Sequence, residues 1–135
     1  MTVKNLFRVA ALLTLVLGLV WMLFPEAMLT GWGATASDIA IYMSRRYAAL
    51  FFGYALILWL ARESPQSQAR RAIMAGGFVA TVLMALLSLS GVLTSRITVM
   101  GLFACAIETL LAFGFGYFLF ARVISSLRHN VAALL

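Results

Sequence analysis

Residues 99–121 read VMGLFACAIETLLAFGFGYFLFA, and Glu108 is the only charged side chain among them. A helix of about 20 mostly apolar residues is long enough to cross the hydrocarbon core of a bilayer, which is about 30 Å thick. This stretch therefore predicts a transmembrane helix. A carboxylate inside such a helix costs about 3 kcal/mol on insertion scales, so we expect Glu108 to face protein, water or a partner.

Three other segments have the same apolar character and a similar length. The first ends before Pro25, which has no N–H to donate and restricts the residue that precedes it. The second begins after Asp38, which we expect to be its N-cap. The sequence therefore predicts an all-α fold, a four-transmembrane-helix bundle that forms a single domain. The expected spans are residues 6–24, 39–60, 72–93 and 99–121 of the domain 1–135, with loops at 25–38, 61–71 and 94–98.

The composition excludes a soluble protein. Of the 135 residues 64% are hydrophobic and 10% are charged, whereas a soluble domain is about half apolar and about a quarter charged. The formal net charge of the chain is +6, and such a charge is also found in proteins that bind nucleic acid. The cations, however, lie at the ends of the apolar runs and not on one water-facing patch interleaved with aromatic residues. We therefore expect the lipid bilayer as a partner and no nucleic acid.

The basic residues set the expected orientation of the bundle. The cytoplasmic loops of a membrane protein carry an excess of Lys and Arg. On the side of the membrane opposite to the N-terminus lie Arg45, Arg46 and Arg96. The side of the N-terminus carries more basic residues than these three. We therefore expect the N-terminus, the 61–71 loop and the C-terminus in the cytoplasm, which is an N-in/C-in topology. The basic residues on the expected cytoplasmic side are Lys4, Arg8, Arg62, Arg70, Arg71, Arg122 and Arg128.

A secretory signal peptide is the alternative interpretation of the N-terminus, because Lys4 and Arg8 precede an apolar run. The run is long for a signal peptide. The small-x-small pattern that a signal peptidase needs, Ala-Thr-Ala at residues 34–36, also lies well beyond Pro25. We therefore interpret residues 6–24 as a span.

The direction in which Glu108 points can be predicted from spacing. Residues three, four and seven apart share one face of a helix. Small residues let neighbouring backbones approach closely in membranes, so a face rich in them is expected to be packed. We therefore expect Glu108 to lie on the packed side of its helix. The residues that share its face are Gly101, Cys105, Ala112 and Gly116.

The second expected span carries two arginines close to its start. Arg46 shares a face with Tyr42, Ala49 and Gly53, which is again a face of small residues. Arg45 lies on a more apolar face, from which its long side chain can reach the headgroups. We therefore expect Arg46 to point inward, at the depth of the acidic residue in the last span, and Arg45 to point outward.

These expectations bring Arg46, Glu108, Tyr42 and Ser88 together in the outer half of the bundle. One interpretation is structural: a buried ion pair of Arg46 with Glu108 that fixes the register of the helices. Another is functional: a polar floor for a ligand, or a site for a proton. The third interpretation places Glu108 against another subunit. The sequence leaves all three open.

No cofactor and no metal site is expected. Cys105 is the single cysteine, which excludes a disulfide framework and a metal site built from cysteines. His129 is the single histidine and lies on a basic tail, so a haem site with two histidine ligands is excluded. The methionines are scattered along the chain and are interpreted as packing residues. No phosphate-binding loop or nucleophile triad occurs, so no catalytic residue is expected.

Several short patterns together resemble a known group of membrane proteins. They are Leu-Phe-Pro at residues 23–25, Gly-Trp-Gly at residues 31–33, Arg-Tyr-Ala-Ala-Leu-Phe-Phe-Gly at residues 46–53, and Glu108 in the last span. With these features the chain resembles the small four-helix bacterial proteins grouped as DoxX-like. The resemblance covers most of the chain and implies a multi-pass protein of the cell inner membrane. Some members of that group are subunits of respiratory or redox assemblies, but the resemblance implies no reaction.

The leading functional hypothesis is a non-enzymatic membrane module. It would bind a lipophilic small molecule or a larger membrane partner within the bundle, with Arg46 and Glu108 supplying the polar contact. The first alternative is a small transporter that works as a homo-oligomer, with Glu108 alternating between proton and substrate cation. Small multidrug exporters carry their essential glutamate in the first span, however, where this chain has only Thr14 as a mid-span polar group. The second alternative is a membrane enzyme in which Glu108 and Tyr42 act as acid and base on a lipid-like substrate.

Overall fold

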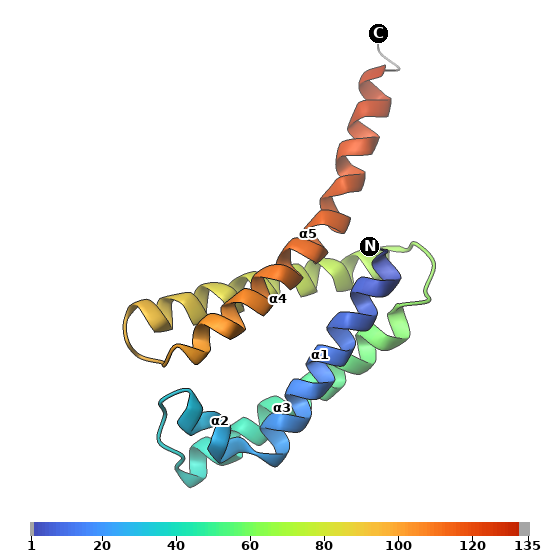
Figure 1. Ribbon diagram of the computed structural model, residues 1–135. Helices are drawn as coiled ribbons and strands as arrows, with labels where there is room; N and C mark the ends of the chain where they lie inside the picture. Colours follow the sequence, from blue (N-terminus) through green and yellow to red (C-terminus); the bar gives the residue numbers. More distant parts are fainter. Residues whose placement is uncertain (1, 133–135) are drawn as a thin grey trace.

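The computed structural model describes residues 2–132, and it describes their side chains as far as residue 121. The part of the chain that it describes is built from helices, and Figure 1 shows them as two hairpins, α1 with α3 and α4 with α5. The expected basic tail with Arg122, Arg128 and His129 lies outside the described side chains. The helices are α1 (Val3–Leu23), α2 (Pro25–Gly31), α3 (Asp38–Ala61), α4 (Gln68–Leu93) and α5 (Met100–Ala132).

Three of the helices are long and apolar enough to cross a membrane. They are α1, α4 and the Met100–Ala121 part of α5. These three helices correspond to predicted spans, and their length and composition indicate a membrane protein. The fourth predicted span corresponds to α3, whose 24 residues include Arg45 and Arg46. Since these arginines shorten its apolar part, α3 is not among the helices that meet the requirement, and its crossing stays a prediction.

The loop predicted over residues 25–38 is wrong in its first half, where the chain forms α2. Pro25 begins this helix. A proline is well tolerated there because its missing N–H would have no partner in the first turn and its fixed φ suits a helix. Pro25 therefore ends α1 and starts another helix, instead of starting a loop.

The predicted N-cap of α3 is also displaced by one residue. The cap is Ser37, whose hydroxyl accepts a hydrogen bond from the N–H of Ala40 at 3.3 Å. Asp38 is the first residue of the helix. Its carboxylate still lies close to the positive end of the helix dipole, so both side chains favour a helix start here.

The first hairpin packs through a stripe of small side chains on α3. Ser44, Ala48 and Ala55 are buried, together with Leu58, and they lie at helical spacing on the face toward α1. Lipid is as apolar as leucine, so close van der Waals packing and not water exclusion holds such helices together. The small side chains give the two backbones the close approach that this packing needs.

The two hairpins meet at a cluster of buried side chains, which we call the hairpin junction. It lies near the amino end of α1, where the rings of Phe7 and Phe115 are 6.2 Å apart. Gly77 of α4 lies against them: a Cβ added to it would be 2.7 Å from the Tyr54 hydroxyl oxygen and 2.9 Å from Phe115. All four long helices therefore contribute to the junction. Its buried members include Leu6, Phe7, Leu58, Met74 and Phe115.

A second contact joins the hairpins at their other end. The hydroxyl of Thr98, just before α5, donates a hydrogen bond to the carbonyl of Gly31, and its N–H donates to the carbonyl of Trp32 at 3.2 Å. Figure 1 shows this end, where α2 lies beside the turn between α4 and α5. The hairpins are thus tied at both ends, whereas α1 and α5 share few contacts elsewhere.

Candidate functional site

Glu108 of α5 forms a hydrogen bond with a residue of α4. The hydroxyl of Ser88 lies 3.0 Å from a carboxylate oxygen of Glu108 and donates a hydrogen bond to it. Ser88 is buried and Glu108 is partly buried. This bond crosses between the two helices of the second hairpin, so the structure brings together two of the residues that the sequence singled out.

The predicted packed face of α5 is confirmed. Gly101, Ala112 and Gly116 are buried on the face that α5 turns to α4. A Cβ added to Gly116 would lie 3.0 Å from the ring of Phe78. The small side chains therefore let α4 approach α5 closely, and the hydrogen bond of Glu108 forms within that contact.

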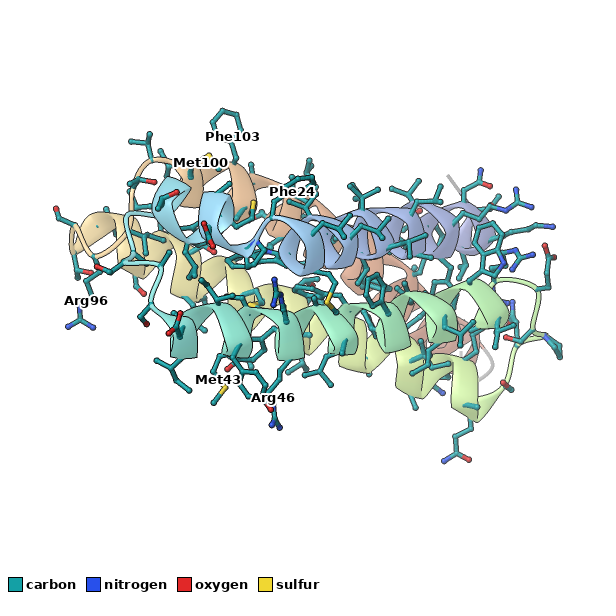
Figure 2. The ribbon with its side chains drawn as sticks, turned by 90° about the horizontal axis from the view of Figure 1, so that it is seen from below. Phe24, Met43, Arg46, Arg96, Met100 and Phe103 are labelled. Carbon is teal, nitrogen blue, oxygen red and sulfur yellow. The ribbon has the colours of Figure 1, made fainter. Side chains whose placement is uncertain are left out.

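The predicted ion pair of Arg46 with Glu108 is wrong. The Arg46 side chain is exposed, and it belongs to no ion pair among the residues whose side chains are described. Its guanidinium lies 5.9 Å from the centre of the Tyr42 ring, and that ring is exposed too. Figure 2 shows Arg46 pointing away from the other helices. Arg45 is exposed as predicted, but Arg46 does not point inward.

Arg46 does not point inward because a different face of α3 packs against α1. The face with Tyr42, Ala49 and Gly53 is exposed, and a Cβ added to Gly53 would meet no atom within 4 Å. The neighbouring face with Ser44 and Ala48 packs against α1 instead. Arg46 therefore lies on the outer side of the first hairpin, while Glu108 lies inside the second.

A cavity that the sequence did not predict runs along the second hairpin. Its volume is about 460 Å³, and residues of α4 and α5 line it. We call it the α4–α5 groove. The α5 residues of the lining that carry polar side-chain atoms are Thr109, Cys105 and Tyr117. Glu108 and Ser88 are not among the lining residues. The large apolar side chains that line the groove are Phe78, Val82, Leu86, Leu89, Phe113 and Phe120.

A cluster of charges lies at the end of the first hairpin and was also not predicted. Glu63 follows α3, and its carboxylate lies 2.7 Å from the Lys4 ammonium and 3.6 Å from nitrogens of both Arg8 and Arg62. The hydrogen bond from Lys4 holds the pKa of the Glu63 carboxyl below its ordinary value, and the neighbouring positive charges lower it further. The sequence signal was present, because these residues all belong to the expected cytoplasmic side.

Among the described residues, no group of three or more His, Cys, Asp or Glu side chains is placed to hold a metal ion. Cys105 is a free thiol, half-buried on α5.

Residues 1–122 match a family described as a domain of unknown function, DUF8292. The chain belongs to the DUF8292 family. The DUF8292 region includes both hairpins, the α4–α5 groove and the Ser88–Glu108 bond, and it ends within α5. No curated protein and no solved structure matches this DUF8292 chain. The resemblance to DoxX-like proteins stays a prediction.

Proposed function

We propose that this protein is a non-enzymatic module of the inner membrane that binds a lipophilic molecule in the α4–α5 groove. The single observation that carries the proposal is the groove itself. Its volume of about 460 Å³ is within the range of about 300–1,000 Å³ that small-molecule sites occupy. Its lining is almost wholly apolar, as a site for a molecule that arrives through the lipid requires.

The lining also explains how such a molecule would be oriented. Thr109 and Tyr117 each carry a hydroxyl that can donate or accept a hydrogen bond, in surroundings that are mostly apolar. A few polar groups among many apolar ones are what fixes a ligand in a small-molecule site. We therefore propose a long apolar ligand with a single hydroxyl or carbonyl group.

In this proposal Glu108 and Ser88 are positioning residues. Their hydrogen bond joins α4 to α5 beside the groove, on the packed face that also carries Ala112. Interhelical hydrogen bonds in membranes contribute about 0.6 to 1.7 kcal/mol. The bond would hold the two helices at the spacing that keeps the groove open.

The proposal includes a fourth crossing by α3 and an N-in/C-in topology. Support for the crossing comes from α1, because α3 packs along a helix that is apolar enough to span. Support for the orientation comes from the basic residues beside Glu63, which the positive-inside rule assigns to the cytoplasm. The resemblance to DoxX-like proteins supports the inner membrane as the location.

Photolabelling tests the proposed ligand site. The purified protein is labelled with a diazirine derivative of hexadecanol, with and without excess unlabelled hexadecanol, and the labelled peptides are mapped by mass spectrometry. We expect labelling on groove residues of α4 and α5 that the competitor displaces. Labelling spread evenly over all exposed apolar faces, and not displaced by the competitor, would contradict the proposal.

A pair of substitutions on α4 supplies the control. Ala85 lines the groove, whereas Ala80 is exposed on the same helix and does not line it. We expect Ala85→Phe to fill the groove and remove the displaceable labelling. Ala80→Phe adds the same ring outside the groove and should leave the labelling unchanged. Equal labelling of both variants would show that the groove is not the site.

A further inference from the structure

A second cavity lies at the end of the molecule where α4 begins. Its volume is about 520 Å³, and it is lined by Val3 of α1, by the start of α4 with the residues before it, and by α5 residues between Tyr117 and Ala121. We call it the interfacial cavity. Its polar wall consists of Gln66, Ser67, Gln68, Arg70 and Arg71.

The two arginines of this wall differ in how they are held. One terminal nitrogen of Arg70 donates a hydrogen bond to the carbonyl of Ser64 at 2.9 Å, and the guanidinium lies 5.7 Å from the centre of the Phe7 ring. Arg71 is exposed and takes part in no ion pair among the described side chains. One positive charge is therefore fixed in place, and the other is free to move toward a ligand.

The charge around the cavity is uncompensated. Among the described residues that line it, none is acidic. Glu63, the carboxylate that follows α3, is already surrounded by Lys4, Arg8 and Arg62. A negatively charged group would therefore be attracted to Arg70 and Arg71 without competition from a neighbouring acid.

The opposite wall of the cavity is apolar. It includes Met74, Phe118 and Leu119, together with Val3 of α1. A small inorganic anion would gain no binding free energy from contact with an apolar wall. A molecule with a negative headgroup and hydrocarbon chains would match both walls, and basic pockets between membrane helices on the cytoplasmic side bind such lipids.

We propose that the interfacial cavity binds an anionic phospholipid. Its headgroup phosphate would be held by Arg70 and Arg71, and the upper part of its acyl chains would lie against Met74 and Phe118. The start of α4, where the Ser67 hydroxyl accepts a hydrogen bond from the Arg70 N–H, lies beside the same wall, and the positive end of the helix dipole adds to the attraction for a phosphate.

This site is separate from the proposed ligand site in the α4–α5 groove. Tyr117 lines both cavities, but the arginines line only the interfacial one. One of the two proposals can therefore be wrong while the other holds. Ala85→Phe, which fills the groove, should leave phospholipid binding unchanged.

Native mass spectrometry of the full chain tests the proposal. The protein in detergent is titrated with phosphatidylglycerol and, separately, with phosphatidylcholine of the same acyl chains. We expect tighter binding of phosphatidylglycerol. The Arg70→Gln, Arg71→Gln double variant should bind phosphatidylglycerol about thirtyfold more weakly, from about 1 kcal/mol for each basic side chain near a membrane surface. Its affinity for phosphatidylcholine should fall much less, because the choline ammonium of that lipid already neutralises its phosphate.

Three further variants separate the proposed site from loss of folding and from unspecific charge effects. Arg70→Lys with Arg71→Lys keeps both charges and should keep the preference for phosphatidylglycerol. Arg71→Gln alone should lose part of it, since this exposed side chain can change without disturbing the fold. Arg45→Gln with Arg46→Gln removes the same charge from α3 and should have no effect. Equal affinities of the wild type for the two lipids, or an equal loss in the α3 control, would overturn the proposal.

Discussion

Ser88 of α4 donates a hydrogen bond of 3.0 Å to the carboxylate of Glu108 on α5. The bond lies within the second hairpin, on a face where small residues bring the two backbones close together. A buried carboxylate with a hydrogen-bond donor from the neighbouring helix costs less than one facing lipid. Glu108 thus has a defined partner, and that partner is a serine and not an arginine.

We expect the effects of Ser88→Ala and Glu108→Ala on stability to be non-additive. Each variant removes the same hydrogen bond, so the double variant should lose about 0.6 to 1.7 kcal/mol less than the sum of the single variants. The measurement is the free energy of unfolding in mixed detergent and dodecyl sulfate. Arg46→Ala with Glu108→Ala is the matched control, and it should give additive losses because Arg46 is exposed on the other hairpin. Coupling of Glu108 to Arg46 but not to Ser88 would contradict the geometry.

The second prediction concerns two adjacent glycines of α4. Gly77→Leu should destabilise the fold by at least about 1–3 kcal/mol, because its new side chain would overlap Tyr54 and Phe115 in the hairpin junction. Gly76→Leu is the control: a Cβ there meets no atom within 4 Å. It should be tolerated, since the new side chain faces lipid. The same unfolding measurement distinguishes the two, and a greater loss at Gly76 would show that the junction is placed wrongly.

The third prediction concerns how the stability of the fold depends on pH. Lys4 lowers the pKa of Glu63 in the folded protein relative to the unfolded chain. The charge cluster therefore stabilises the fold at pH values above the ordinary pKa of a carboxyl group. This contribution is lost as the pH falls through the lower pKa of the folded state. Glu63→Gln should therefore reduce the thermal unfolding temperature more at about pH 7 than at about pH 3.

Glu26 is the control for this acid effect. It is exposed in the first turn of α2 and forms no ion pair among the described residues. Glu26→Gln should therefore change the unfolding temperature less than Glu63→Gln at about pH 7. An equal effect of Glu63→Gln at both pH values would mean that the cluster adds no pH-dependent stability.

The fourth prediction tests the proposed topology. In a Cys105→Ser background, cysteines are introduced as Gln66→Cys between α3 and α4 and as Thr35→Cys between α2 and α3. A membrane-impermeant maleimide added to intact cells should label position 35 and not position 66. Permeabilised cells should show labelling at both, which controls for accessibility. Labelling of position 66 from outside would reverse the orientation.

Much of the fold was predictable, because the length of an apolar run limits where a span begins and ends. The predicted spans 72–93 and 99–121 correspond to α4, which runs from Gln68 to Leu93, and to the apolar part of α5. The packed side of α5 was predictable for a similar reason. Between Met100 and Ala121, four small residues share the face of Glu108, the single charged side chain of that stretch.

The position of Arg46 was not predictable from spacing. Small residues occur on two neighbouring faces of α3, one with Ala49 and Gly53 and one with Ala48 and Ala55. Spacing shows that each face could pack, and only the contact with α1 decides between them. The α4–α5 groove could not be predicted either. Its volume depends on how far apart two helices lie, which no pattern within one helix determines.

The ion pair of Lys4 with Glu63 joins the start of α1 to the residues just after α3. The small-residue stripe of α3 and the charge cluster both lie within the first 63 residues, so the internal contacts of the first hairpin need no residue of α4 or α5. The first hairpin is therefore a packing unit of its own, and the hairpin junction, to which Phe115 contributes, joins it to the second.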